Sequence, residues 1–471
     1  MPPRPIAGGP KSGVVVRAPR PRLAATRMPG WGWLEWVVVA QTALPAMLFV
    51  PGMAPIRTLT RVAAFGISLT ALAAVGLSGR RAHGRRFPAI PWLAAAAVWL
   101  CMSILHPGLN SPISGIAQVT LNLAIMAPAF WGGAAMSDPR QLTRLMLLLL
   151  VCNGASALMG IGQFYRPSIF DPPVMNIVGP EGTKGMLSIE TADGRKVVRP
   201  CGLTDAPGGA AAGGAMAALV GLSWALRSVP RWQRLGSLGL ALVGVAVIYL
   251  SQVRSVLIML VVSLVFMFAL LLLRGDVRKA ILLGGGTLLT LVLGMLWTLR
   301  VGSAAVAARF LDLLSSPASK TYHDNRGRFL AETFERFIWD MPLGAGLGRW
   351  GMMYANFGDH APSLDRGMLW AELQWTAWLY DGGLPLMVLY VGALTVAIAN
   401  TMSIARTCQD KEISFWAVPI FGLGLSAVAM CFNAIPFIGP GGVQFWALFA
   451  ALHAAAERTR IRAKRERRLP A

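Results

Sequence analysis

The chain has 471 residues, of which 55% are hydrophobic and only 14% are charged, and its mean hydropathy is +0.56. A soluble chain carries roughly 25% charged residues, so this composition excludes an ordinary soluble protein. Disorder over most of the chain is excluded because it requires low hydrophobicity, and 5 cysteines are too few for a disulfide scaffold. What remains is a polytopic membrane protein in which 43 basic residues face 21 acidic ones.

Apolar runs of about 20 residues mark membrane-spanning helices. The chain contains about twelve such runs, so we predict an all-α polytopic membrane protein. The predicted spans are 31–50, 62–78, 89–105, 116–136, 145–164, 207–226, 235–252, 256–273, 280–298, 383–405, 415–435 and 442–456. The longest connection between them joins the ninth and tenth spans.

These spans divide the chain into five segments. They are a basic, Pro-rich tail (1–30), helices one to nine (31–298), a long loop with amphipathic helices (299–382), helices ten to twelve (383–456) and a second basic tail (457–471). Most basic residues lie in the tails and in the even-numbered connections, so the positive-inside rule predicts that both termini are cytoplasmic. The excess charge is therefore a topology signal, and we expect no nucleic-acid partner.

The opposite face carries a different balance of charge. The 165–205 connection has five basic and five acidic residues, and the 299–382 loop has eight basic and nine acidic residues. Such balance is typical of extracytoplasmic segments that fold and carry function. We therefore look for functional residues on this face, because polar residues near a membrane are costly and commonly functional.

Two arginines lie at predicted span ends on the outer face. Arg199 begins the motif Arg-Pro-Cys-Gly-Leu before the sixth span, where it either binds a phosphate or a lipid headgroup or serves as an interfacial anchor. Arg254 lies in the short turn between the seventh and eighth spans. A lone arginine there runs against the inside bias, so it requires an acidic partner from the long loop or an anionic ligand.

An amphipathic helix is predicted from Arg326 onwards, because apolar residues recur every three to four positions up to Met341. It is expected to lie on the outer membrane surface or to cover the helix bundle. Arg326 and Arg328 stand at its beginning, where a helix N-terminus favours anions and guanidinium groups bind phosphate in a bidentate manner. In the alternative interpretation, both arginines pair with Asp324 and Glu332.

A glycine-rich segment, 342–348, follows this helix and precedes Arg349. It lacks the preceding strand and the glycine spacing of a dinucleotide-binding loop, so we reject that function. We expect a flexible turn over a cavity, and we include Arg349 among the candidate substrate-binding residues.

The end of the loop holds three further candidates, His360, Glu372 and Gln374. An acid among aromatic residues just before a span could act as a general base or could pair with an arginine. The aromatic residues Trp375, Trp378 and Tyr380 form either an interfacial belt or a sugar-stacking platform. The five histidines are scattered, so we predict neither a metal site nor a cofactor.

Five short motifs together resemble the superfamily of bacterial O-antigen ligases and O-antigen or exopolysaccharide polymerases. The motifs are Arg199-Pro-Cys-Gly-Leu, Ser251-Gln-Val-Arg-Ser, Asn325-Arg-Gly, Pro342-Leu-Gly-Ala-Gly-Leu-Gly and Asp381-Gly-Gly. The resemblance covers roughly 145–400 in sequence and the rest in topology only.

This resemblance implies an inverting, metal-independent glycosyltransferase of the C type in the bacterial inner membrane. Its members transfer a glycan from an undecaprenyl-diphosphate carrier to an acceptor sugar on the extracytoplasmic side, within machinery for polysaccharide assembly. By motif, Arg254 and Arg326 would bind the diphosphate, and Arg199 would support them.

The chain departs from the ligase pattern in the long loop. Ligases have His-Asn about a dozen residues before the glycine that opens the tenth span, and here Glu372 stands near that position. Either Glu372 or the upstream His360 would then activate the acceptor, and we favour Glu372. This departure favours a polymerase over a ligase.

Two other functions remain open from the sequence. A flippase for lipid-linked oligosaccharides or another transporter would also have about twelve spans, but it would usually carry repeats, broken helices and ion sites within the membrane. We find no repeat, and Glu35 is the only acid inside a predicted span. A non-catalytic scaffold in polysaccharide assembly is the third interpretation.

Overall fold

The computed structural model describes residues 30–79, 84–172, 188–190, 196–204, 206, 208–302, 322–361 and 366–467. The chain divides into two units, Met1–Gly30 and Trp31–Ala471, and every element described below belongs to the second. The predicted tail 1–30, apart from its last residue, lies outside the described residues, as does the part of the predicted loop at 303–321.

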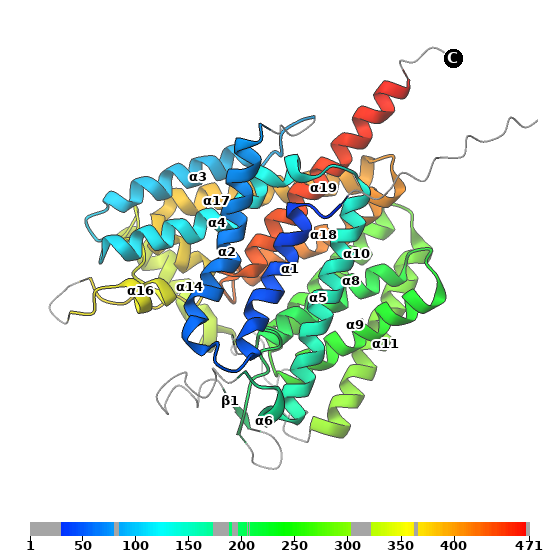
Figure 1. Cartoon of the computed structure of the whole chain (residues 1–471), viewed down its shortest axis with the longest axis horizontal. Helices are drawn as coiled ribbons and strands as arrows, with labels where there is room; N and C mark the ends of the chain where they lie inside the picture. The colour runs from blue at the N-terminus through cyan, green and yellow to red at the C-terminus, as the bar shows by residue number, and fades with distance from the viewer. Residues whose placement is uncertain are drawn as a thin grey trace, which may run out of the picture. The chain divides into compact units, whose positions relative to one another are not determined.

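The part of the chain up to residue 302 is a succession of helices (Figure 1). Its elements are α1 (Trp33–Ala46), η1 (Met47–Phe49), η2 (Ala54–Ile56), α2 (Arg57–Leu77), α3 (Ile90–Met102), η3 (Ser103–Leu105), α4 (Pro112–Ala135), α5 (Arg140–Tyr165), α6 (Pro167–Phe170), α8 (Gly209–Ala225), α9 (Arg231–Leu250), α10 (Arg254–Leu273) and α11 (Val277–Gly302).

Short helices precede three long ones in the rest of the chain. The elements are η5 (His323–Gly327), α14 (Arg328–Glu332), η6 (Thr333–Phe337), α15 (Ile338–Asp340), α16 (Gly351–Phe357), α17 (Gln374–Thr407), α18 (Lys411–Met430), η7 (Pro436–Ile438) and α19 (Pro440–Glu466). Among these, η5 and η6 are π-helical turns, so residues 323–340 form one continuous run of helix.

The helices have the composition of a membrane-embedded protein. Within the described residues, eight helices are long and apolar enough to cross a membrane, and α1 with η1, α3 with η3 and α8 are shorter apolar helices. Each of the twelve predicted apolar segments lies on a helix, so the predicted helical membrane class is confirmed. The last segment, 442–456, lies on α19, which is less apolar and belongs to neither group.

Small residues allow close approach between α8 and α9. A Cβ atom built on Gly214 would lie 2.5 Å from the carbonyl oxygen of Gly244, and one built on Gly244 would lie 2.3 Å from that of Gly214. Helices in lipid associate through such backbone contacts because water-driven burial is weak there. The Gly- and Ala-rich composition of these segments is thereby explained.

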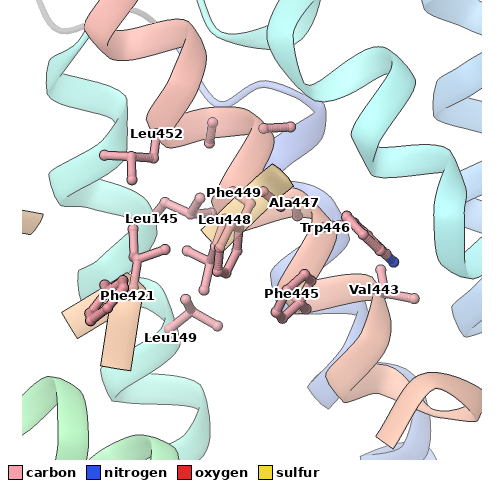
Figure 2. Close-up of a cluster of buried hydrophobic side chains, with 14 of the residues drawn as sticks. Leu145, Leu149, Phe421, Val443, Phe445, Trp446, Ala447, Leu448, Phe449 and Leu452 are labelled. Carbon is pink, nitrogen blue, oxygen red and sulfur yellow. The ribbon is translucent and has the colours of Figure 1, made fainter. Parts of the chain in front are cut away.

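Helix α19 carries much of the buried apolar surface. Its apolar residues from Val443 to Leu452 are almost fully buried, and they pack against Leu145 and Leu149 of α5 and Phe421 of α18 (Figure 2). The rings of Phe445 and Phe449 stack with their centroids 4.2 Å apart. The end of the chain is thus anchored inside the bundle.

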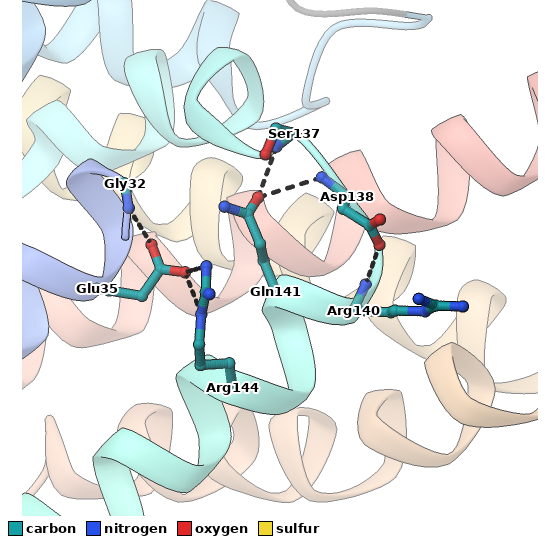
Figure 3. A network of polar contacts seen from close by, with 7 residues as sticks. All are labelled: Gly32, Glu35, Ser137, Asp138, Arg140, Gln141 and Arg144. Carbon is teal, nitrogen blue, oxygen red and sulfur yellow. Dashed lines mark hydrogen bonds and ion pairs between the residues drawn. The ribbon is translucent and has the colours of Figure 1, made fainter. Parts of the chain in front are cut away.

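Glu35, the acid expected inside the first span, is an internal ion-pair partner. Its side chain is fully buried; Oε1 accepts a hydrogen bond from Arg144 Nε at 2.8 Å and also pairs with Arg144 Nη2, and Oε2 accepts from the Gly32 N–H at 2.9 Å (Figure 3). Removing one partner of such a buried pair is costly because it leaves an uncompensated charge. The pair ties α1 to α5.

One feature departs from the predicted all-α class. Within the 165–205 connection, β1 (Ser188–Glu190) and β2 (Lys196–Val198) form an antiparallel pair in which Ile189 lies opposite Val197. A two-stranded sheet has unpaired edges that only water or protein can satisfy. Its presence fits a segment outside the lipid.

The helix that carries the tenth predicted span, 383–405, starts upstream of that span. Helix α17 begins at Gln374 and is broken at Gly382 and Gly383, where Gly383 has φ 65°. The two glycines therefore form a kink within a longer helix and do not mark its start. Asp381, which the sequence assigned to the outer loop, is consequently buried inside the helix, with 3% of its surface exposed.

The glycine-rich segment 342–348 is packed rather than flexible, so the expectation of a flexible turn over a cavity was wrong. Residues 344–348 are all buried. At the break in α17, Ala345 N–H donates to Tyr380 O at 3.0 Å, and Leu384 N–H donates to Pro342 O at 2.9 Å. The glycines permit backbone to touch backbone, and the segment satisfies the polar groups that the kink frees.

Candidate functional site

The structure joins two of the predicted catalytic residues. Arg326 lies in the π-helical turn η5, and Glu372 lies in the extended segment just before α17. Arg326 Nη1 forms an ion pair with Glu372 Oε2. Asp324, the other acid predicted as a partner for these arginines, has a side chain outside the described residues. π-Helical turns occur frequently at functional sites.

Sequence analysis missed a third member of this group, Trp370. Its indole Nε1 donates a hydrogen bond to Glu372 Oε1 at 2.7 Å, while 60% of its surface remains exposed. In an extended segment, residues two apart face the same side. That spacing is the signal that could have identified Trp370, which offers an exposed ring beside the carboxylate.

The helix run 323–340 is held against the start of α17. Thr333 and Thr376 share a buried hydrogen bond of 2.7 Å between their hydroxyl groups, and the rings of Phe334 and Trp375 lie 5.8 Å apart. Tyr322 donates its hydroxyl hydrogen to Phe432 O at 2.8 Å. The predicted amphipathic helix therefore covers the bundle, and its packing positions Arg326 over Glu372.

Arg326 lies in a partly desolvated setting. Burial lowers the pKa of its guanidinium group, and the nearby Tyr322 opposes that shift. The open hollow of about 540 Å³ on the same helix run is lined by other residues, among them Tyr322, Leu330 and Glu335, and not by Arg326. A partly desolvated guanidinium is nevertheless suited to bind an anionic group.

Arg328 pairs with an acidic residue of its own helix, as the alternative interpretation of the sequence expected. Its Nε lies 3.5 Å from Glu332 Oε1, and 69% of its side chain is exposed. An exposed pair of this kind contributes only about 0–1 kcal/mol to stability. Its predicted role in substrate binding stays a prediction.

Two of the three aromatic residues fit neither predicted role. Trp378 is 1% exposed and stacks on Tyr390 with centroids 4.8 Å apart, and Tyr380 is 3% exposed. Neither can meet a headgroup or a sugar, since both lie in the core. Trp375 is half-buried and packs on Phe334, so it serves to hold the helix run in place.

Arg254 begins α10 directly after a strained turn. Gln252 has φ 53°, the only positive value outside glycine among the described residues, and only 4% of its surface is exposed. Such strain persists only where the surroundings enforce it and often marks a functional site. Ser251 is fully buried, and its hydroxyl has no hydrogen-bond partner within the described part of the chain. The turn therefore presents Arg254 from a rigid support.

Gln163, which the sequence did not single out, fixes the Arg199 turn. Its Oε1 accepts from the N–H groups of Cys201 at 2.9 Å and Gly202 at 2.8 Å, and its Nε2 donates to Gly202 O at 2.9 Å and Phe170 O at 3.2 Å. Arg199 is half-buried, and its Nε is without a partner among the described residues.

Gln163→Ala is expected to lower the free energy of unfolding by about 2–4 kcal/mol, because it leaves several buried backbone groups without partners. The measurement is thermal unfolding of the purified protein in detergent. Gln233→Ala on α9 is the matched control, since the side chain of Gln233 makes no hydrogen bond with the described residues. Equal unfolding temperatures for the two variants would refute this role of Gln163.

The turns of Arg199 and Arg254 both contact the start of α8. Ala210 N–H donates to Pro200 O at 3.3 Å, and a Cβ atom built on Gly208 would lie 3.4 Å from Val253 Cγ2. A helix N-terminus carries partial positive charge. Two arginine-bearing turns therefore meet at an electropositive helix end.

The remaining predicted residues have structural contacts. Arg349 donates to the carbonyl oxygens of Ala345 at 2.9 Å and Gly367 at 3.2 Å, and Gln374 is 1% exposed and accepts from the Phe437 N–H at 2.9 Å. His360 is exposed and packs edge-on against Tyr354. Of the two acceptor-side candidates, Glu372 is the better placed, because it pairs with Arg326 whereas the ring contact of His360 is with Tyr354.

Across the described residues, no group of three histidine, cysteine, aspartate or glutamate side chains could hold a metal ion. No family model and no curated protein matches the chain. The geometry of the residues themselves thus carries the functional argument.

Proposed function

We propose that the protein is an integral membrane glycosyltransferase that extends or transfers glycan from an undecaprenyl-diphosphate-linked donor to an acceptor sugar, as a polysaccharide polymerase rather than a ligase. The observation that carries this proposal is the ion pair between Arg326 and Glu372. The sequence motifs predict complementary roles for the two residues: Arg326 binds the leaving diphosphate, and Glu372 activates the acceptor hydroxyl. Their proximity is what a group-transfer site requires.

The proposed topology has twelve spans in the bacterial inner membrane. Both termini are cytoplasmic, and the site is extracytoplasmic, in the loop between the ninth and tenth helices. The bias of basic residues and the agreement of every predicted span with a helix support this topology. O-antigen, exopolysaccharide and capsule assembly are the processes to which such an enzyme would belong.

In the proposed mechanism, the ion pair is the resting state of the site. The donor diphosphate competes with Glu372 for Arg326 and is also bound by Arg254, with Arg199 in support. Glu372, released from its partner, accepts the proton of the acceptor hydroxyl while that oxygen bonds to the anomeric carbon. The bond from this carbon to the diphosphate oxygen breaks with inversion, and the arginines stabilise the charge that develops on the leaving group.

Trp370 would stack on the sugar that lies next to Glu372, since its ring is exposed and its Nε1 orients the carboxylate. Arg328, Arg349, His360 and Gln374 would bind more distant parts of the glycan or maintain the loop that does so. The contacts of Arg349 and Gln374 favour the second role for these two.

One observation favours the transporter alternative. Helix α17 is broken at Gly382–Gly383, and Asp381 is buried beside the break, which resembles the ion sites of transporters. However, its Oδ1 accepts from Trp350 Nε1 at 2.8 Å, and its Oδ2 accepts from Gln118 Nε2 at 2.8 Å and Asn122 Nδ2 at 3.5 Å. Both oxygens are thus engaged by neutral donors, so we assign Asp381 to the architecture of the site.

The experiment that separates these functions uses purified protein in proteoliposomes with a lipid-linked glycan. We expect elongation at the same rate with and without an imposed proton or sodium gradient. Asp381→Asn should lower the unfolding temperature, because the carboxylate stabilises the fold through its hydrogen bonds. The rate of elongation should stay independent of the gradient in this variant. Gradient-driven movement of the lipid-linked glycan that Asp381→Asn abolishes would instead establish a transporter.

A further inference from the structure

Two adjoining cavities lie far from the Arg326–Glu372 pair, near the other end of α17. The first, of about 590 Å³, is lined by the ends of α17 and α19, and the second, of about 620 Å³, by α2, α3 and α4. Both are also lined by Arg85, Arg86 and His453. Because α17 has 34 residues, up to about 50 Å of helix separates these cavities from Glu372.

The first cavity is strongly basic. It is lined by Arg85, Arg86, Arg460, Lys464 and Arg467, against the single acid Glu457. Glu457 Oε2 is already engaged, because it accepts from Arg460 Nη2 at 2.7 Å and from the Arg85 N–H at 3.2 Å. Arg85, Arg86 and Lys464 have no ion pair with any described residue. The cavity therefore carries positive charge that its own wall does not neutralise.

The segment that carries Arg85 and Arg86 is held in place by its backbone. The backbone N–H of Arg85 donates a hydrogen bond to Glu457, and the backbone carbonyl oxygen of Arg85 lies 3.0 Å from Nε2 of His453. His453 is 7% exposed. Since a carbonyl oxygen only accepts, Nε2 carries the hydrogen. Both arginine side chains thus project from a fixed segment, which reduces the entropy lost when they bind a ligand.

Most of the residues that line the second cavity are apolar. Leu72, Val75, Phe87, Ile90 and Phe130 line it, together with Trp131. Trp131 is 1% exposed. These side chains form a wall that is suited to the hydrocarbon part of an occupant.

We propose that these cavities together bind one acidic phospholipid. The phosphate lies among the basic side chains of the first cavity, and one acyl chain enters the second. Basic pockets between membrane helices are suited to anionic headgroups, and guanidinium groups are suited to phosphate. The apolar cavity next to the phosphate site selects a lipid over a small soluble phosphate.

The competing explanation is that these basic residues only determine membrane topology. A topology signal requires charge near the span ends, without a shared cavity, a fixed backbone or an adjoining apolar pocket. The two explanations differ in what they predict for arginines elsewhere. Arg278 and Arg465 are exposed basic residues that line neither cavity, and they provide matched controls.

The test is native mass spectrometry of the full-length protein released from bilayers of phosphatidylcholine and phosphatidylglycerol. We expect one retained phosphatidylglycerol in the wild type, binding at least about tenfold weaker in Arg86→Gln/Lys464→Gln, and wild-type binding in Arg278→Gln/Arg465→Gln. Equal loss in both double variants, or no retained lipid in the wild type, would overturn the proposal.

Two soluble phosphates that lack acyl chains distinguish binding of a lipid from binding of a free phosphate. Inorganic phosphate and glycerol 3-phosphate, each at the total concentration of the lipid, are expected to leave phosphatidylglycerol bound because neither fills the apolar cavity. Ile90→Trp, which fills that cavity, should reduce lipid retention as well. Displacement of the lipid by either soluble phosphate at that concentration would refute the lipid assignment.

Discussion

Arg326→Ala is expected to lower the rate of glycan transfer by on the order of 10²-fold or more, because it removes a charge that stabilises the leaving diphosphate. The same variant leaves Glu372 without its ion-pair partner at the edge of α17. Arg326→Lys should recover only part of the rate, since an ammonium group cannot bind phosphate in a bidentate manner. Elongation of a lipid-linked glycan by the purified variants measures the effect.

Arg336→Ala is the matched control for Arg326→Ala. Arg336 lies on the same helix run, is 74% exposed, and pairs with Asp340 at 3.1 Å. Wild-type rates are expected for this variant, whereas Glu372→Gln should reproduce most of the loss because it keeps the shape of the side chain and removes its basicity. If Arg326→Ala reaches the membrane and makes normal polymer, the site assignment is wrong, and the scaffold interpretation gains support.

Gly383→Ala is expected to destabilise the protein by several kcal/mol. Gly383 has φ 65° and ψ −160°, a backbone region that is essentially restricted to glycine and costs another residue about 1–3 kcal/mol. In addition, a Cβ atom there would lie 2.1 Å from Pro342 O, on the segment that docks against the broken helix. The variant should unfold at a markedly lower temperature in detergent, and glycan transfer should fall with it because the loop that carries the site is displaced.

Gly239→Ala on α9 provides the control for this substitution. Nothing lies within 4 Å of a Cβ atom built on Gly239, so alanine adds helix propensity without a clash. We expect an unfolding temperature equal to or above that of the wild type. An unchanged unfolding temperature in Gly383→Ala would show that the docking of 342–348 on α17 does not stabilise the fold.

The helices could be predicted from the sequence because lipid imposes a local rule. Backbone groups in hydrocarbon must be paired within the segment, so an apolar run of sufficient length becomes a helix whatever its neighbours are. The helix that begins near Arg326 could be predicted for a similar reason, since its 3–4 periodicity is local. The start of α17 could not be predicted, because Gly382 and Gly383 are equally consistent with a helix start and with a kink.

The contacts that build the site depend on distant segments. Whether Glu372 is a base or an ion-pair partner was left open by the sequence, and the structure shows the pair with Arg326. The burial of Asp381 depends on Trp350 and Gln118, which no local pattern connects to it. The packing of 342–348 likewise depends on a break in a helix that lies far along the chain.

The central claim is that the site around Arg326 and Glu372 transfers glycan from a lipid diphosphate. The most direct measurement follows a defined undecaprenyl-diphosphate-linked oligosaccharide with the purified wild-type protein in lipid nanodiscs, without nucleotide sugar and with a chelator present. We predict longer lipid-linked glycans together with one released undecaprenyl diphosphate for each glycosidic bond formed. Intact donor after long incubation with folded protein and a competent acceptor would contradict the account.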